Sequence, residues 1–158
     1  MVYKRNSRLH QGSREENAVI YHQVRMAMKP DAPADQVRHA LDLMRELGEK
    51  LDAVEFHLVG CDFGGEFDYG ALYALKDIDA YRTYMYDPLH RRIDALGLPL
   101  VADMVSSDLT DDPDPDIGAK IAQVHADRFS DHPELRHLVE NLGSYEGSGV
   151  DDGGPEPA

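Results

Sequence analysis

The chain has little of what marks several common protein classes. It has one cysteine, Cys61, so no disulfide can form within it and nothing points to an oxidising compartment. No apolar run approaches the length of a membrane span. The N-terminus is polar and lacks the apolar middle of a signal peptide. These absences predict a soluble, cytoplasmic protein that does not enter a membrane.

Positive charge is also scarce. The 158 residues include 16 Lys and Arg against 30 Asp and Glu, which gives a formal net charge of −14. Because nucleic acids and anionic membranes bind basic surfaces, this balance argues against both partners. The hydrophobic share of 42% is enough for the core of one domain of ordinary size.

The composition changes along the chain and predicts four segments. Residues 1–17 are polar and basic, without an apolar period, and are expected to be a flexible arm. Residues 18–109 carry the periodic apolar pattern of the folded domain. Residues 110–143 begin with the acidic run TDDPDPD and continue as a helical extension, and residues 144–158 are rich in glycine and acid and are expected to be disordered.

The domain pattern predicts an α+β fold. Residues 18–29 alternate as a strand, residues 34–51 have helical spacing, and two further strands, 53–60 and 68–75, flank a glycine turn. A broken helix over 77–97 and a strand over 98–109 follow. The order is ferredoxin-like, βαββαβ, with an antiparallel sheet covered by helices on one face. Residues 117–128 and 134–142 predict two extra C-terminal helices.

A sheet covered on one face leaves the other face in need of a cover. Phe56, Leu58 and Tyr21 or their neighbours would lie on that open face. A second copy of the same sheet is the simplest cover, because a symmetric dimer uses one patch twice. The pattern therefore predicts a homodimer.

The stretch AYRTYMYDPLHRRIDALG, residues 80–97, carries the most suggestive pair of side chains. Pro88 lacks a backbone N–H and disfavours helix at the residue before it, so the helix must bend at this point. Tyr84 lies before the bend and His90 after it. The pair could direct a phenol and an imidazole into one cleft, or could simply pack beneath the sheet.

Other histidines are candidates for metal ligands or pocket residues. His22 shares a strand face with Ile20 and Val24, so it is either a satisfied core histidine or lines a cavity, and the facing of His57 stays open. His125, His132 and His137 are too widely spaced for a compact metal site. No glycine-rich loop opens a helix after a strand. We expect no metal and no cofactor.

Residues 20–109 resemble the Dabb family, the stress-responsive dimeric α/β-barrel proteins. The resemblance rests on IYHQVRMAMKPDAP, AVEFHLVGCDF, FDYGALYALKDIDAYRTY and YDPLHRRIDALG followed by LVADMVSSD. It implies a dimeric α/β barrel. A plant polyketide cyclase of this family closes its substrate by cofactor-free aldol condensation, and its histidine and tyrosine align with His90 and Tyr84. A further histidine aligns with His22, whereas a pocket histidine is replaced by Tyr69.

Three functions therefore stay open. The first is a cofactor-independent aldol-type cyclase of polyketide-like compounds, with His90 as base and Tyr84 as hydrogen-bond donor. Its substrate pocket would be lined by five residues: His22, Val24, His57, Tyr69 and Tyr73. The second is a cofactor-free monooxygenase on an aromatic polyketide. The third is a non-catalytic dimer that binds a ligand or acts as a scaffold.

Overall fold

The structure, a computed structural model, describes residues 18–148. The arm expected at 1–17 and the end of the tail at 149–158 lie outside the described residues. The strands are β1 (Ile20–Met28), β2 (Val54–Cys61), β3 (Tyr69–Leu75), β4 (Val101–Thr110) and β5 (Ser144–Gly147). The helices are α1 (Ala34–Lys50), α2 (Ile78–Tyr86), α3 (Pro88–Gly97), the 3₁₀ turn η2 (Leu98–Leu100), α4 (Ile117–Asp131) and α5 (Pro133–Glu140).

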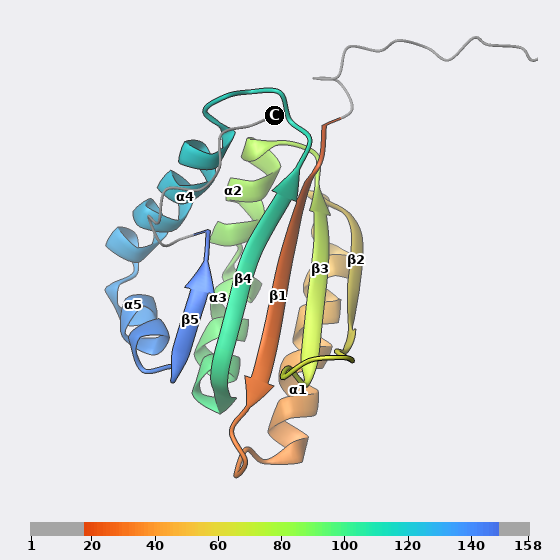
Figure 1. Cartoon of the computed structure of the whole chain (residues 1–158), viewed down its shortest axis with the longest axis vertical. Coiled ribbons are helices and arrows are strands. Elements are labelled where there is room, and N and C mark those ends of the chain that lie inside the picture. Colours follow the sequence, from red (N-terminus) through yellow and green to blue (C-terminus); the bar gives the residue numbers. More distant parts are fainter. Residues whose placement is uncertain (1–17, 149–158) are drawn as a thin grey trace, which may run out of the picture.

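The strands form one mixed sheet in the order β2-β3-β1-β4-β5 (Figure 1). The first four pair antiparallel, whereas β5 pairs parallel to β4. The helices lie behind the sheet in the view of Figure 1, with α4 and α5 beyond β5. This is the ferredoxin-like α+β fold that the sequence predicts, with two helices and one strand added at its C-terminal end.

Strand β1 is central and shows why one face of the sheet is buried. Ile20, His22 and Met26 are buried under the helices, whereas Tyr21 and Gln23 between them are exposed. Strand geometry sends alternate side chains to opposite faces, so the apolar row of the sequence becomes the inner face. On the helical side, α1 buries Val37 and Leu41 against this row.

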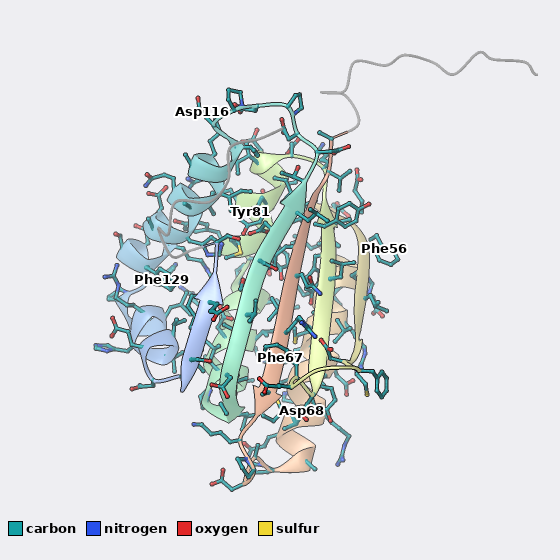
Figure 2. The ribbon with its side chains drawn as sticks, in the orientation of Figure 1. Phe56, Phe67, Asp68, Tyr81, Asp116 and Phe129 are labelled. Atoms are coloured by element: carbon teal, nitrogen blue, oxygen red, sulfur yellow. The ribbon has the colours of Figure 1, made fainter. Side chains whose placement is uncertain are left out.

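The opposite face of the sheet is open. Its large apolar side chains are exposed, with Phe56 at 53% and Leu58 at 59% of full exposure. Tyr21 and Leu109, which pair across β1 and β4, are also exposed. In Figure 2 the Phe56 ring projects from β2 at the edge of the sheet. The protomer therefore exposes the apolar sheet face that the sequence predicts to be covered by a second copy.

The bend at Asp87 is built by local chemistry. Helix α2 ends at Tyr86, and Asp87 is extended at φ −59° and ψ 135°. The Asp87 carboxylate then accepts a hydrogen bond of 2.8 Å from the backbone N–H of Leu89, which caps α3. Pro88 occupies the first turn of α3, where its missing N–H costs nothing.

The C-terminal extension is more ordered than the sequence predicts. In the acidic linker, the side chains of Asp112 and Asp114 each accept a hydrogen bond from the backbone N–H two residues later. Helix α4 buries Ile121 and Val124 in the core. Contrary to the expected disordered tail from residue 144, Ser144–Gly147 form β5, because the edge of β4 offers free backbone partners.

Among residues 18–148, no helix combines the length and the apolar character needed to cross a bilayer.

Candidate active site

A cavity of about 90 Å³ lies between the inner face of the sheet and the helices. Its walls are largely apolar and include Val24, Met26, Leu41, Met44, Ile93 and Met104. Polar side chains also line it, among them His22, Tyr73, Tyr84, His90, Asp94, His125 and Arg128. An apolar cavity with a few convergent polar groups is the usual form of a small-molecule site.

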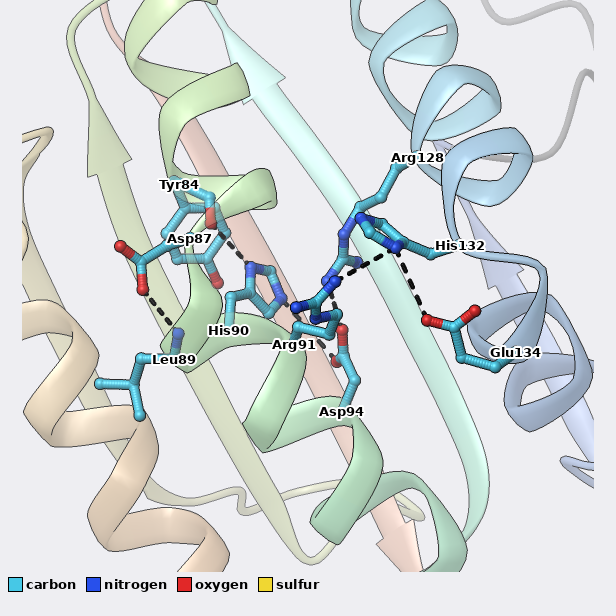
Figure 3. Close-up of polar contacts among 9 residues, drawn as sticks. All are labelled: Tyr84, Asp87, Leu89, His90, Arg91, Asp94, Arg128, His132 and Glu134. Atoms are coloured by element: carbon cyan, nitrogen blue, oxygen red, sulfur yellow. Dashed lines mark hydrogen bonds and ion pairs between the residues drawn. The ribbon is translucent and has the colours of Figure 1, made fainter.

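His90 is held in one orientation by the bend that precedes it. The residue is 9% exposed, and Nδ1 lies 2.9 Å from the backbone carbonyl oxygen of Tyr84 (Figure 3). A carbonyl oxygen can only accept, so Nδ1 carries the hydrogen and donates it. The neutral ring then has its lone pair on Nε2.

Burial fixes the charge of this ring. It lowers the pKa of His90 to about 4, since the attraction of Asp94 is outweighed by desolvation and by the nearby Arg128 cation. His90 is therefore neutral at neutral pH, and its Nε2 is available as a base.

Tyr84 lies against His90, with ring centroids 4.6 Å apart. Its ring is also 4.8 Å from Tyr73 and 5.5 Å from His22, measured between centroids. Burial raises the pKa of Tyr84 well above its usual value, so the hydroxyl keeps its proton. Tyr84 can therefore donate a hydrogen bond inside the cavity.

A buried ion pair lies next to His90. The Nη2 of Arg128 donates to Oδ2 of Asp94 at 2.5 Å. The other carboxylate oxygen, Oδ1, lies 3.8 Å from Nε2 of His90, beyond hydrogen-bond distance. Figure 3 shows His90 and Asp94 on successive turns of α3, with Arg128 reaching them from α4. Two acceptors thus face each other across a gap that a donor with two hydrogens, such as a water, could bridge.

A second polar network fixes the orientation of His22, which is 2% exposed. Nδ1 of His22 lies 2.8 Å from Oδ1 of Asp108, and the Tyr81 hydroxyl donates to Oδ2 at 3.0 Å. Burial alone would raise the pKa of Asp108, but the His22 charge and hydrogen bond hold it below its usual value. The carboxylate is ionised and accepts from both neighbours.

The same network reaches α4. Nε2 of His125 lies 2.8 Å from the Tyr81 hydroxyl. Because the single hydroxyl proton goes to Asp108, the Tyr81 oxygen accepts here and His125 donates. Burial lowers the pKa of His125 to about 4, so this ring is neutral as well.

The structure brings most of the predicted site residues together. His90, Tyr84, His22, Tyr73 and Val24 all line the cavity. The two others, His57 and Tyr69, are not among its lining residues. His57 faces α1, so close to Gly48 that a Cβ there would be 2.2 Å from its ring. Tyr69 begins β3 opposite Met26, partly buried against the core.

Four polar side chains near the cavity were not predicted as site residues from the sequence: Asp94, Asp108, His125 and Arg128. Asp94 follows His90 by four residues, a spacing that places both on one helix face. His125 and Arg128 continue the buried face of Val124 and Ile121, so helical periodicity carried a signal. Their contacts with Tyr81 of α2 and Asp94 of α3 depend on the tertiary fold and could not be predicted from helical periodicity.

The loose histidine cluster does not assemble. His125 is buried at Tyr81, whereas His137 is 82% exposed and 3.6 Å from Glu140. In the described part of the chain, no three His, Cys, Asp or Glu side chains are grouped as metal ligands.

Comparison with protein families matches residues 20–111 to Dabb, the Stress responsive A/B Barrel Domain. The match spans more than half of the chain, so the protein belongs to the Dabb family. Arg128, His125 and all of α4, α5 and β5 lie outside the matched segment. Comparison with curated proteins finds no match.

Solved structures share the fold. A dimeric ferredoxin-like protein of unknown function from Thermobifida fusca is 24% identical, with a TM-score of 0.54, covering 60% of this chain and 92% of its own. A Dabb family protein from Mesorhizobium loti is 17% identical, with a TM-score of 0.52 and coverage of 58% and 95%. A hydroxynitrile lyase from Passiflora edulis is 13% identical, with a TM-score of 0.54 and coverage of 58% and 92%.

Proposed function

We propose that the protein is a cofactor-independent enzyme of small-molecule metabolism that removes a proton next to a carbonyl group. The reaction that best fits the site is an aldol-type ring closure of a polyketide-like compound. The observation that carries the proposal is the neutral His90, with Nδ1 held by the backbone carbonyl oxygen of Tyr84 and its ring against the Tyr84 ring in a mainly apolar cavity.

In the proposed reaction, Nε2 of His90 takes the proton from a carbon between two carbonyl groups. The electron pair of the C–H bond moves into the enolate, whose oxygen accepts a hydrogen bond from Tyr84. The enolate carbon then attacks a second carbonyl of the same molecule, and the new alkoxide takes the proton back from His90. The negative charge of the enolate stabilises the protonated imidazole, so the pKa of His90 rises as the enolate forms.

The test is proton exchange, because it reports the base whatever the final product is. The full-length protein is incubated in D₂O with acetophenone, and loss of the methyl signal is followed by NMR. His90→Gln, whose amide can still donate to Tyr84 O, is expected to slow enzyme-dependent exchange by about 100-fold or more. His39→Gln, which removes an exposed histidine of α1, is expected to leave it unchanged. Equal exchange by His90→Gln and the unmodified protein would remove His90 as the base.

Assays with further substrates separate the reaction types. Ring closure of a linear poly-β-ketone, followed by mass spectrometry, supports the cyclase. The lyase among the structural neighbours suggests a second substrate, because cyanohydrin cleavage also needs one base and one donor at a carbonyl carbon. Release of benzaldehyde from mandelonitrile would favour that activity instead. Oxygen uptake with an anthrone would favour the monooxygenase. Deuterium exchange without any of these three turnovers would support proton removal next to a carbonyl group and none of the three specific reactions.

The proposal includes a homodimer formed through the open face of the sheet. Phe56, Leu58 and Leu109 are exposed there, and an apolar patch of this kind is normally covered. Similar structures are described as dimeric, which supports the same arrangement for this chain. The mass of the protein in solution, measured by light scattering, tests it.

A further inference from the structure

Arg128 is the unusual member of the site. It comes from α4, beyond the segment that matches the Dabb family, and it is 6% exposed. Burying a guanidinium is costly unless its charge and its donors are used. Asp94 balances the charge, but most of the donors remain to be accounted for.

An arginine side chain carries five N–H groups. Within residues 18–148, the structure records one hydrogen bond of Arg128, from Nη2 to Asp94. In the same part of the chain, no buried side-chain nitrogen or oxygen lacks a hydrogen-bond partner. The remaining N–H groups of Arg128 are therefore not sealed in the core. Arg128 is also one of the residues that line the cavity, so a ligand there comes within reach of its side chain.

We propose that Arg128 binds the carboxylate of the substrate, so that the substrate class is an apolar 3-oxo acid. This inference rests on the proposed function and names what the same site accepts. A planar guanidinium that has spare N–H groups suits a carboxylate, which accepts through two oxygens. The mainly apolar walls of the cavity suit the rest of such a molecule.

The order of the polar groups matches the order of groups in a 3-oxo acid. Asp94 contacts Arg128 through one oxygen and lies 3.8 Å from Nε2 of His90 through the other. Arg128 and His90 thus both lie next to the Asp94 carboxylate, and the Tyr84 ring lies against His90. A 3-oxo acid presents a carboxylate, an acidic CH₂ and a ketone oxygen in succession. These correspond to Arg128, His90 and Tyr84.

Binding of two stable ligands of equal size tests the proposal without any turnover. The full-length protein is titrated at pH 7.5 with 3-phenylpropanoate and with 3-phenylpropanamide, and dissociation constants are measured by calorimetry. The carboxylate is expected to bind at least about tenfold more tightly, the discrimination of one charge-assisted contact. Arg128→Met should abolish this preference. Lys120→Met, which removes an exposed cation of the same helix, should preserve it.

Asp94→Asn gives a change of opposite sign. It removes the carboxylate that competes for Arg128, so the acid should bind about tenfold more tightly while the amide is unaffected. If Arg128→Met fails to fold because Asp94 is left unpaired, Asp94→Asn combined with Arg128→Met replaces it and should bind both ligands equally. Equal binding by the unmodified protein, a preference that survives loss of Arg128, or weaker acid binding in Asp94→Asn would each overturn the proposal. Failure of acetophenone exchange would instead affect only the assignment of His90 as a base.

Discussion

Mild acid should destabilise the fold through His90, and His90→Gln should remove that part of the loss. In an unfolded chain, histidine binds a proton near pH 6.5, whereas burial lowers the pKa of folded His90 to about 4. Between these values the unfolded state binds more protons. The free energy of unfolding is therefore intact above pH 6.5 and falls as the pH falls towards 4.

The size of the effect follows from these two pKa values. At pH 5, the difference in proton binding at His90 lowers the free energy of unfolding by about 2 kcal/mol relative to pH 7.5. Typical domains have about 5–15 kcal/mol in total, so the loss is large enough to measure. His125, whose pKa is also lowered to about 4, adds a second loss of similar size that His90→Gln leaves in place.

Urea denaturation at pH 7.5 and pH 5.0, at one protein concentration, measures the loss for each variant. His90→Gln should lose about 2 kcal/mol less than the unmodified protein on acidification. His39→Gln, at an exposed position, should lose as much as the unmodified protein. An equal loss in His90→Gln would show that His90 titrates normally in the folded state, and the account of its buried, neutral ring would be wrong.

Two further predictions concern the assembly and the packing beneath the sheet. Phe56→Asp should convert the proposed dimer to a monomer in light scattering, whereas Leu96→Asp, at an exposed apolar position on α3, should not; a dimeric Phe56→Asp protein would place the interface elsewhere. Gly48→Ala should destabilise the fold by about 1–3 kcal/mol in urea titrations, because its Cβ would lie 2.2 Å from the His57 ring. Gly97→Ala, whose Cβ would meet Ala40 at an ordinary 3.8 Å, should be neutral or slightly stabilising, and equal losses in both variants would show that the His57 contact does not matter.

The fold could be predicted because its signals are local. Alternation along β1, helical spacing in α1 and the break at Pro88 each depend on a few consecutive residues. Together they predict the βαββαβ order. The short β5 gave no such signal, because Ser144–Gly147 has no apolar alternation and depends on the free edge of β4.

The candidate site could be predicted only in part. His90 and Tyr84 flank the bend at Pro88, so their proximity can be predicted from the sequence. The other polar groups of the site come from distant segments: Asp108, which holds His22, comes from β4, and Arg128, which pairs with Asp94, comes from α4. The facing of His57 also depended on tertiary structure, since it follows from the pairing of β2 with β3, where His57 lies opposite the buried Tyr73, and Gly48 of α1 leaves room for its ring.

The cavity is assembled from two parts of the chain that can change separately. The sheet and the bent helix supply the imidazole and the phenol, whereas the extension after the acidic linker supplies the cation and part of the wall. In the proposed enzyme, apolar wall residues of the extension, such as Phe129 and Leu135, could change which compounds are accepted while His90 and Tyr84 stay in place. If the proposed function holds, the scaffold places much of the selectivity and the reactivity on different segments, a division that would let related chains diversify through the walls supplied by their C-terminal segments.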